Sequence, residues 1–121
     1  MKQILLADDN KDLVSALRLL LETRFGTELI FEARDMEHVL AQVEDTRPDC
    51  LILDWELPGR PIRGRVSVLR TMMPDLKIII TSSQPESKQE ALSEGADEFI
   101  SKSDSPVKIL EVLKKCYQRE E

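Results

Sequence analysis

Residues 48–59, PDCLILDWELPG, decide the fold and raise the question of function. Four apolar residues, 50–53, run without interruption, and a turn signal follows in Pro58 and Gly59. Such a run is typical of a strand that is covered on both faces, as in a parallel sheet. Asp54 then lies where the predicted strand leaves the core. Because an Asp at a strand end often only begins a turn, its role depends on its neighbours.

Short apolar runs alternate with longer helical patterns along the rest of the chain. Four further strands are predicted at residues 3–7, 28–33, 77–81 and 98–102. Helical spacing of apolar residues predicts helices near residues 13–21, 36–43, 66–73, 85–95 and 105–116. Candidate caps precede three of them, at Asp9 or Asn10, at Asp35, and at Ser105 followed by Pro106.

This alternation predicts one α/β domain. Five strands that alternate with five helices imply right-handed crossovers and a parallel sheet covered by helices on both faces. The 121 residues, of which 41% are hydrophobic, suit a single domain over residues 1–121 with one ordinary core. In such sheets, functional polar residues collect at the carboxyl ends of the strands, where the loops form a crevice.

The charge balance argues against some classes of function. There are 17 basic and 23 acidic residues, a net charge of −6, which disfavours charge-driven binding to nucleic acid or to an anionic membrane. The opening residues MKQILLADDN are too short and too polar for a signal peptide or a membrane span. We therefore expect a cytoplasmic protein that binds neither nucleic acid nor membrane directly.

Polar side chains follow four of the predicted strands. They are Asp8 and Asp9 after the first, Asp54 after the third, Thr81 at the end of the fourth and Lys102 at the end of the fifth. Taken singly, each is explained as a helix cap, a strand former or a solvated charge. Taken together, they place three carboxylates, a hydroxyl and an ammonium at one edge of the sheet.

That combination favours metal-dependent phosphoryl chemistry. Carboxylates a few ångströms apart repel one another unless a hard divalent cation holds them ionised, and Mg²⁺ is the natural candidate, with Mn²⁺ as a substitute. Once a metal offsets their charge, Asp54 is placed to attack a phosphorus atom. Lys102 and Thr81 would then receive the oxygens of the transferred group.

On these residues the chain resembles the receiver domains of two-component response regulators, of the chemotaxis-regulator type. The resemblance covers essentially the whole chain. It rests on the acidic pair 8–9, on DWELPG at 54–59, on Thr81 and on GADEFISK at 95–102. It implies a flavodoxin-like (βα)5 three-layer sandwich whose five-stranded parallel sheet has the order 2-1-3-4-5.

The resemblance also implies a signalling module, not an enzyme, with particular roles for its acidic residues. Asp54 accepts a phosphoryl group from a phosphohistidine of a sensor histidine kinase or a His phosphotransfer protein. Asp9, Asp54 and the backbone carbonyl of Glu56 ligate Mg²⁺, and Asp8 acts chiefly through metal-bound water. The side chain of Glu56 is then expected to point to solvent.

The remaining implied roles concern signalling. Thr81 and Lys102 hold the acyl phosphate, and Phe99 falls where the family has an aromatic switch that turns inward when Thr81 moves. A plain core aromatic is an equally good interpretation of Phe99. A downstream protein or an output domain would then bind one of the two states.

The sequence departs from the family pattern in three places, one of which is the polar, Ser-rich segment TSSQPES at 81–87 leading into the fourth predicted helix. Ser103 follows Lys102 where the family usually has Pro. The segment GRPIRGR, residues 59–65, is longer than usual and carries Arg60, Arg63 and Arg65. We expect a solvated loop in preference to the alternative, a role in docking or phosphate steering.

Two other functions stay open from the residues alone. Haloacid dehalogenase-type phosphohydrolases also combine a strand-end Asp with Thr, Lys, an acidic pair and Mg²⁺. They typically have a second Asp where this chain has Glu56, and they are longer. The other alternative is a receiver-like binding module that is never phosphorylated, against which the complete set of acids, Thr81 and Lys102 argues.

Overall fold

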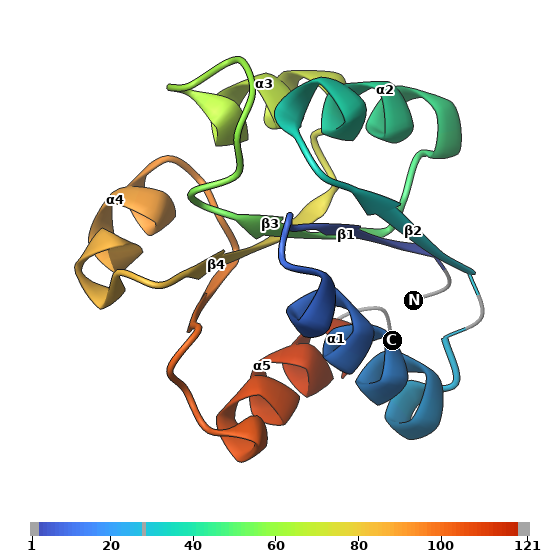
Figure 1. Cartoon of the computed structure of the whole chain (residues 1–121). Helices are drawn as coiled ribbons and strands as arrows, with labels where there is room; N and C mark the ends of the chain where they lie inside the picture. The colour runs from blue at the N-terminus through green and yellow to red at the C-terminus, as the bar shows by residue number, and fades with distance from the viewer. Residues whose placement is uncertain (1–2, 28, 119–121) are drawn as a thin grey trace.

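The computed structural model describes residues 3–27 and 29–118, with side chains as far as residue 115. Strands and helices alternate as predicted (Figure 1). The strands are β1 Gln3–Ala7, β2 Leu29–Ala33, β3 Cys50–Asp54, β4 Lys77–Ser82 and β5 Glu98–Ser101. The helices are α1 Lys11–Phe25, α2 Met36–Thr46, α3 Arg65–Met72, α4 Lys88–Ser93 and α5 Pro106–Gln118, with a 3-10 turn at Pro85–Ser87 before α4.

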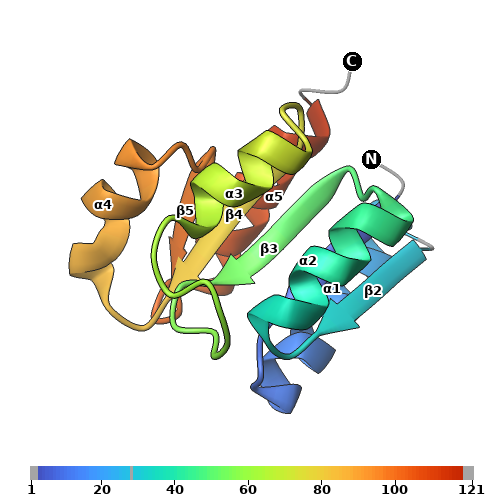
Figure 2. The same ribbon diagram turned by 90° about the horizontal axis from the view of Figure 1, so that it is seen from above.

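All neighbouring strands pair in parallel, and the order β2-β1-β3-β4-β5 confirms the predicted topology. Helices α1 and α5 cover one face of the sheet, and α2 and α3 cover the other, while α4 lies beside the β4–β5 end (Figures 1 and 2). Two apolar clusters fill the spaces between these layers. None of the described helices has the length and apolarity that crossing a membrane requires.

The core explains why polar groups gather at one edge. Along β3, Leu51 and Leu53 pack toward α2 and α3, whereas Cys50 and Ile52 pack toward α1 and α5. All five residues of the strand are buried, so the run of apolar residues does mark a central strand. Because parallel strands all end at the same edge, the residues that follow them meet there.

The helix termini follow capping rules. The Asn10 side chain accepts hydrogen bonds from the backbone N–H groups of Asp12 and Leu13, so Asn10 caps α1 and leaves Asp9 outside the helix. Asp35 caps α2, as predicted. Val107, one of the apolar residues from which the helix at 105–116 was predicted, lies in the first turn of α5 and is exposed. Glu28, expected to begin the second strand, and the side chain of residue 116 lie outside the described residues.

The loop after β3 rests against the start of α2. The backbone N–H of Met36 donates to the carbonyl of Pro58 at 2.9 Å, and the N–H of Arg60 donates to Glu37 Oε2 at 3.1 Å. Gly59 between them has φ 104°, and a Cβ atom there would lie 2.8 Å from the Met36 nitrogen. The close approach of this loop to α2 therefore requires glycine.

Gly59→Ala should lower the free energy of unfolding by about 2–3 kcal/mol, from backbone strain plus the clash with α2. Urea unfolding followed by circular dichroism measures the change. Gly26→Ala is the matched control, because Gly26 also has a positive φ of 64° but a Cβ there meets nothing within 4 Å. Equal losses in the two variants would contradict the argument from close approach.

Candidate functional site

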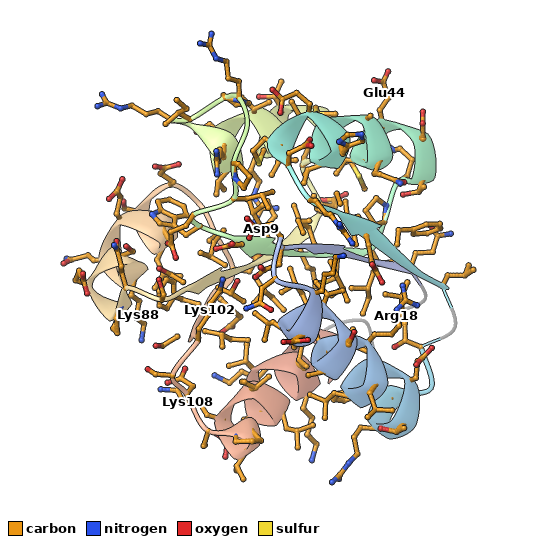
Figure 3. All side chains as sticks on the ribbon, in the orientation of Figure 1. Asp9, Arg18, Glu44, Lys88, Lys102 and Lys108 are labelled. Carbon is orange, nitrogen blue, oxygen red and sulfur yellow. The ribbon has the colours of Figure 1, made fainter. Side chains whose placement is uncertain are left out.

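Three carboxylates meet at the carboxyl edge of the sheet. Asp8 and Asp9 follow β1, Asp54 ends β3, and one carboxylate oxygen of each lies within 4.8 Å of the others. Asp8 and Asp54 are buried, whereas Asp9, which Figure 3 labels at this edge, is exposed. The sequence placed these three residues together correctly.

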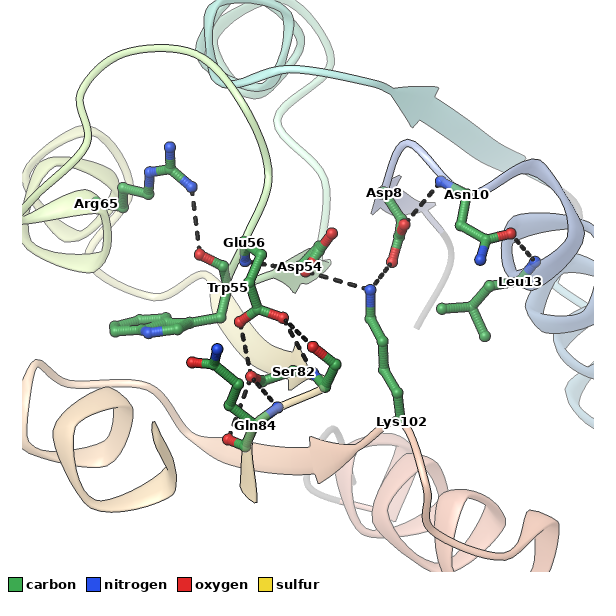
Figure 4. A network of polar contacts seen from close by, with 11 residues as sticks. Asp8, Asn10, Leu13, Asp54, Trp55, Glu56, Arg65, Ser82, Gln84 and Lys102 are labelled. Carbon is green, nitrogen blue, oxygen red and sulfur yellow. Dashed lines mark hydrogen bonds and ion pairs between the residues drawn. The ribbon is translucent and has the colours of Figure 1, made fainter. Parts of the chain in front are cut away.

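Lys102 connects two of these carboxylates. Its Nζ lies 3.0 Å from Asp8 Oδ2 and 3.3 Å from Asp54 Oδ1 (Figure 4). Burial works to lower the pKa of Lys102, but the hydrogen bond to Asp8 and the charges of Asp54 and Asp8 outweigh it, so the pKa lies above its ordinary value. Lys102 is therefore a fixed positive charge inside the acidic cluster.

Asp54 is a carboxylate in an unfavourable environment. Its Oδ1 also accepts a hydrogen bond from the backbone N–H of Glu56 at 3.0 Å. Burial raises the pKa of Asp54, the charge of Asp8 raises it further, and the Glu56 N–H and Lys102 oppose this without reversing it. Additional positive charge beside Asp54 would therefore stabilise its ionised form.

Thr81 and Phe99 occupy neighbouring strands. Thr81 is the register partner of Asp54, so their side chains lie on the same side of the sheet, and its hydroxyl bonds to no other described residue. Phe99 pairs in register with Ile80 and is buried in the cluster under α2, α3 and α4. Its environment is that of a core aromatic, and its role as a switch stays a prediction.

The oxygen atoms at this edge fit a hard divalent cation. Asp8 Oδ2 is buried, and apart from its ionic contact with Lys102 it has no hydrogen-bond partner among the described residues. The carbonyl of Glu56 likewise accepts no hydrogen bond within the described part of the chain. Carboxylate and carbonyl oxygens are the ligands that Mg²⁺ prefers. The donor set therefore matches the predicted metal.

Glu56 is exposed, as expected, but its carboxylate is held by hydrogen bonds from the end of β4 and the loop after it. Its Oε2 accepts a hydrogen bond from the Ser82 hydroxyl at 2.7 Å, and its Oε1 accepts from the N–H and the hydroxyl of Ser83, both at 3.0 Å (Figure 4). Burial works to raise the pKa of Glu56, but these bonds outweigh it and lower that pKa. Glu56 thus links the loop after β3 to the loop after β4.

The segment at residues 59–65, predicted as a solvated loop, is only partly solvated. Arg60 and Arg63 are exposed, but Arg65 is buried at 7% exposure. Its guanidinium donates to the backbone carbonyls of Pro61 at 2.6 Å, Gly59 at 2.9 Å and, more weakly, Trp55 at 3.5 Å. Arg65 therefore lies in the interior of the loop, where it bonds three of the loop's backbone carbonyls.

The backbone at Ser103, just after β5, has an ordinary conformation. The Lys102–Ser103 peptide is trans, since Arg60–Pro61 is the one cis bond within the described residues. The hydroxyls of Ser103 and Ser101 lie 2.8 Å apart, and Asp104 Oδ2 accepts a hydrogen bond from the Ser101 N–H. These contacts close the turn that begins with Lys102.

A parallel sheet of this order, with an acidic cluster and a lysine at its carboxyl edge, defines a flavodoxin-like protein with a candidate metal-dependent site. The sequence model of the response regulator receiver domain matches residues 4–114. The chain belongs to this family. The match favours a receiver domain over both alternatives, the phosphohydrolase and the module that is never phosphorylated, and members of the family are signalling modules.

Individual relatives agree with this assignment. The phosphate regulon transcriptional regulatory protein PhoB of Pseudomonas aeruginosa is 31% identical over 122 aligned positions, which cover 98% of this chain and 52% of that protein. The chemotaxis protein CheY of Thermotoga maritima is 26% identical, with 94% of this chain and 96% of that protein covered. The chain thus spans about half the length of PhoB and nearly the whole of CheY.

Among solved structures, the response regulator TrrA of Thermotoga maritima, in complex with Mg²⁺ and BeF, superposes with a TM-score of 0.82. It is 29% identical, and the match covers 96% of this chain and 99% of that one. A CheY-like receiver domain protein from Methanospirillum hungatei superposes with a TM-score of 0.83 at 25% identity, over 99% of this chain and 97% of that one.

Proposed function

We propose that Asp54 accepts a phosphoryl group from a phosphohistidine of a sensor histidine kinase or a His phosphotransfer protein. The observation that carries the proposal is the placement of Asp54 against Lys102, with Asp8 and Asp9 beside them. A carboxylate oxygen of Asp54 forms a bond to phosphorus as the phosphorus–nitrogen bond to the donor imidazole breaks. The released imidazole takes up a proton from solvent.

Each neighbouring side chain has a role in this transfer. Lys102 exchanges its contact with Asp54 for an oxygen of the phosphoryl group, and the Thr81 hydroxyl donates to another. Mg²⁺ would neutralise charge that builds up on the transferred oxygens. Asp9, Asp54 and the Glu56 carbonyl would hold it, and Asp8 would bind through a metal-coordinated water. The Mg²⁺–BeF complex of TrrA supports this role.

The phosphorylated state would then be read by a partner. In the proposed switch Thr81 moves toward the phosphoryl group and Phe99 follows it, which changes the surface offered to a downstream protein or an output domain. PhoB, about twice as long as this chain, is named as a transcriptional regulator. For this chain, a single domain over residues 1–121, a cytoplasmic location and the absence of direct nucleic-acid binding stay predictions.

Incubation with acetyl phosphate and Mg²⁺ should give at most one phosphoryl group per chain, and the group should be stable to acid and labile to base. A receiver stores the acyl phosphate, because no positioned base activates water against it. Intact-protein mass spectrometry measures the stoichiometry. The same incubation with EDTA is the control and should give no incorporation.

The phosphohydrolase alternative makes the opposite prediction. It requires rapid multiple turnover of ordinary phosphate monoesters, with Glu56 as the base, so Glu56→Gln would abolish turnover. The bonds from Ser82 and Ser83 to both oxygens of Glu56 argue against a base that is free to activate water. Turnover that is lost in Glu56→Gln would overturn the proposed function.

Asp9→Asn should weaken Mg²⁺ binding by about tenfold, because one anionic oxygen ligand is lost from a site with few protein ligands. Titration of Trp55 fluorescence with MgCl₂ measures the affinity, since Trp55 directly follows Asp54. Asp12→Asn, an exposed change in the first turn of α1, is the control and should bind Mg²⁺ as the wild type does. Equal affinities in the wild type and Asp9→Asn would place the metal elsewhere.

A further inference from the structure

We propose that Arg65 is a positioning residue for the phosphorylation of Asp54, acting through the loop that joins β3 to α3. The inference rests on the proposed function and assigns a role to a residue on the far side of that loop. Three features carry it: the carbonyl groups that Arg65 holds, the peptide to which one of them belongs, and the charge that it places near Asp54.

The guanidinium of Arg65 organises the loop from within. Arg65 begins α3, after Gly64, and its three bonds reach backward along the chain to Pro61, Gly59 and Trp55. A loop of this length has no strand or helix partner for these carbonyls. Because these part-buried bonds to a charged guanidinium are stronger than neutral ones, Arg65 stabilises this path of the loop.

One of these carbonyls belongs to the peptide that holds Asp54. The carbonyl of Trp55 and the N–H of Glu56 are the two polar groups of a single planar peptide unit. Arg65 donates to the carbonyl, and the N–H donates to Asp54 Oδ1 (Figure 4). The contact from Arg65 is long, at 3.5 Å, so Arg65 favours the orientation of the peptide that positions the attacking carboxylate without fixing it alone.

The preceding peptide is also anchored, and the following one carries the proposed metal ligand. The N–H of Trp55 donates to the carbonyl of Thr81 at 2.7 Å, which anchors the start of the segment to β4. The next carbonyl along the chain is that of Glu56. Because the two peptides before it are anchored to β4 and to Arg65, this carbonyl has less freedom to leave the metal site.

The charge of Arg65 acts in the same direction. Burial lowers the pKa of Arg65, while the negative charges of Asp54 and Glu37 work to raise it, so Asp54 and the guanidinium interact electrostatically. A cation bonded to the carbonyl polarises the peptide and makes its N–H a stronger donor to a carboxylate. That donor holds Asp54 Oδ1 in position.

The test compares four variants. Arg65→Met removes the bonds and the charge, Arg65→Lys keeps the charge but not the planar fork, and Arg63→Met removes an exposed arginine of the same loop. Val66→Ala, a buried change in α3, serves as a destabilised control. Calorimetric titration with MgCl₂ and the rate of phosphorylation by acetyl phosphate are measured below each variant's Tm.

Arg65→Met should weaken Mg²⁺ binding about fivefold to tenfold and slow phosphorylation about tenfold, the loss expected for a charge-assisted bond. Arg65→Lys should recover part of each loss. Arg63→Met should match the wild type, and Val66→Ala should lower Tm without changing the Mg²⁺ affinity. A wild-type Mg²⁺ affinity and phosphorylation rate in Arg65→Met would overturn the inference. So would a loss of Mg²⁺ affinity in Val66→Ala equal to that in Arg65→Met, if the two variants have the same Tm.

Chemical rescue separates positioning from folding. Arg65→Ala leaves a space beside the three carbonyls, and guanidinium chloride at about 20 mM should restore at least half of the lost Mg²⁺ affinity, whereas urea at the same concentration should not. No rescue, with Arg65→Lys as defective as Arg65→Met, would contradict the proposal. A wild-type protein that takes no phosphoryl group and binds no Mg²⁺ would overturn the proposed function as well.

Discussion

Asp54→Asn should abolish phosphorylation and yet make the metal-free protein more stable. Asn has no carboxylate to attack phosphorus, so incorporation from acetyl phosphate should fall below detection. The gain in stability should be about 1 kcal/mol at neutral pH, or roughly 4 °C in Tm, because a buried charge beside Asp8 is removed. Most substitutions at buried positions have the opposite effect on stability.

The pH dependence of that gain follows from the raised pKa of Asp54, which burial causes and Asp8 increases. A carboxyl whose pKa is higher in the folded than in the unfolded state binds its proton more tightly when folded. Stability therefore falls as pH rises from the ordinary Asp pKa to the folded value. The gain in stability of Asp54→Asn over the wild type should be complete at pH values above the folded pKa of Asp54. It should be absent below the ordinary Asp pKa.

Thermal unfolding in EDTA between pH 3.5 and 8 measures this difference. Asp45→Asn, an exposed change on α2, is the control and should leave Tm within a degree of wild type. Added Mg²⁺ should narrow the difference, because it stabilises the wild type more than Asp54→Asn. An Asp54→Asn protein that is less stable at neutral pH, or still phosphorylated, would contradict the assignment of this residue.

Lys102→Met should slow phosphorylation of Asp54 by about 100-fold or more, the usual loss when one group that stabilises developing charge is removed. Met keeps the length and the apolar stem of the side chain but lacks the ammonium. Without it, the contacts at 3.0 Å to Asp8 and 3.3 Å to Asp54 are lost. The cluster of carboxylates then has no positive side chain in its midst.

Stability should report the same loss. The free energy of unfolding in EDTA should fall by about 2 kcal/mol, less than for a fully buried pair because Lys102 keeps some exposure. Mg²⁺ should restore part of this loss, since it supplies positive charge at the same place. Lys108→Met on α5 is exposed and should match the wild type in both measurements. A phosphorylation rate within twofold of wild type would remove Lys102 from the proposed chemistry.

The positions of residues at the carboxyl ends of the strands were predictable from the sequence. Strand ends in a parallel sheet share an edge, so Asp8, Asp54 and Lys102 had to lie close together once the strands were recognised. The caps at Asn10 and Asp35 followed from local hydrogen bonding, although Asp9 competed with Asn10 until the helix start was known.

Contacts between loops were not predictable in the same way. Glu56 reaches Ser82 across 26 positions, and neither residue has a periodic pattern that would indicate the contact. Arg65 lies among other arginines in a polar segment, and composition suggested solvent. Only the path of the loop reveals the carbonyls that require its guanidinium. Side-chain partners of this kind are set by tertiary geometry, for which the sequence has no local signal.

The hydrogen bonds from Ser82 and Ser83 to Glu56 bear on how much of the unphosphorylated protein adopts the shifted state. Thr81 directly precedes these serines, so the proposed shift of Thr81 would pull on bonds that Glu56 accepts. Every 1.4 kcal/mol that those bonds add to the resting arrangement lowers the spontaneous population of the shifted one about tenfold. The background output without a phosphate signal would then depend on a carboxylate that takes no phosphate itself.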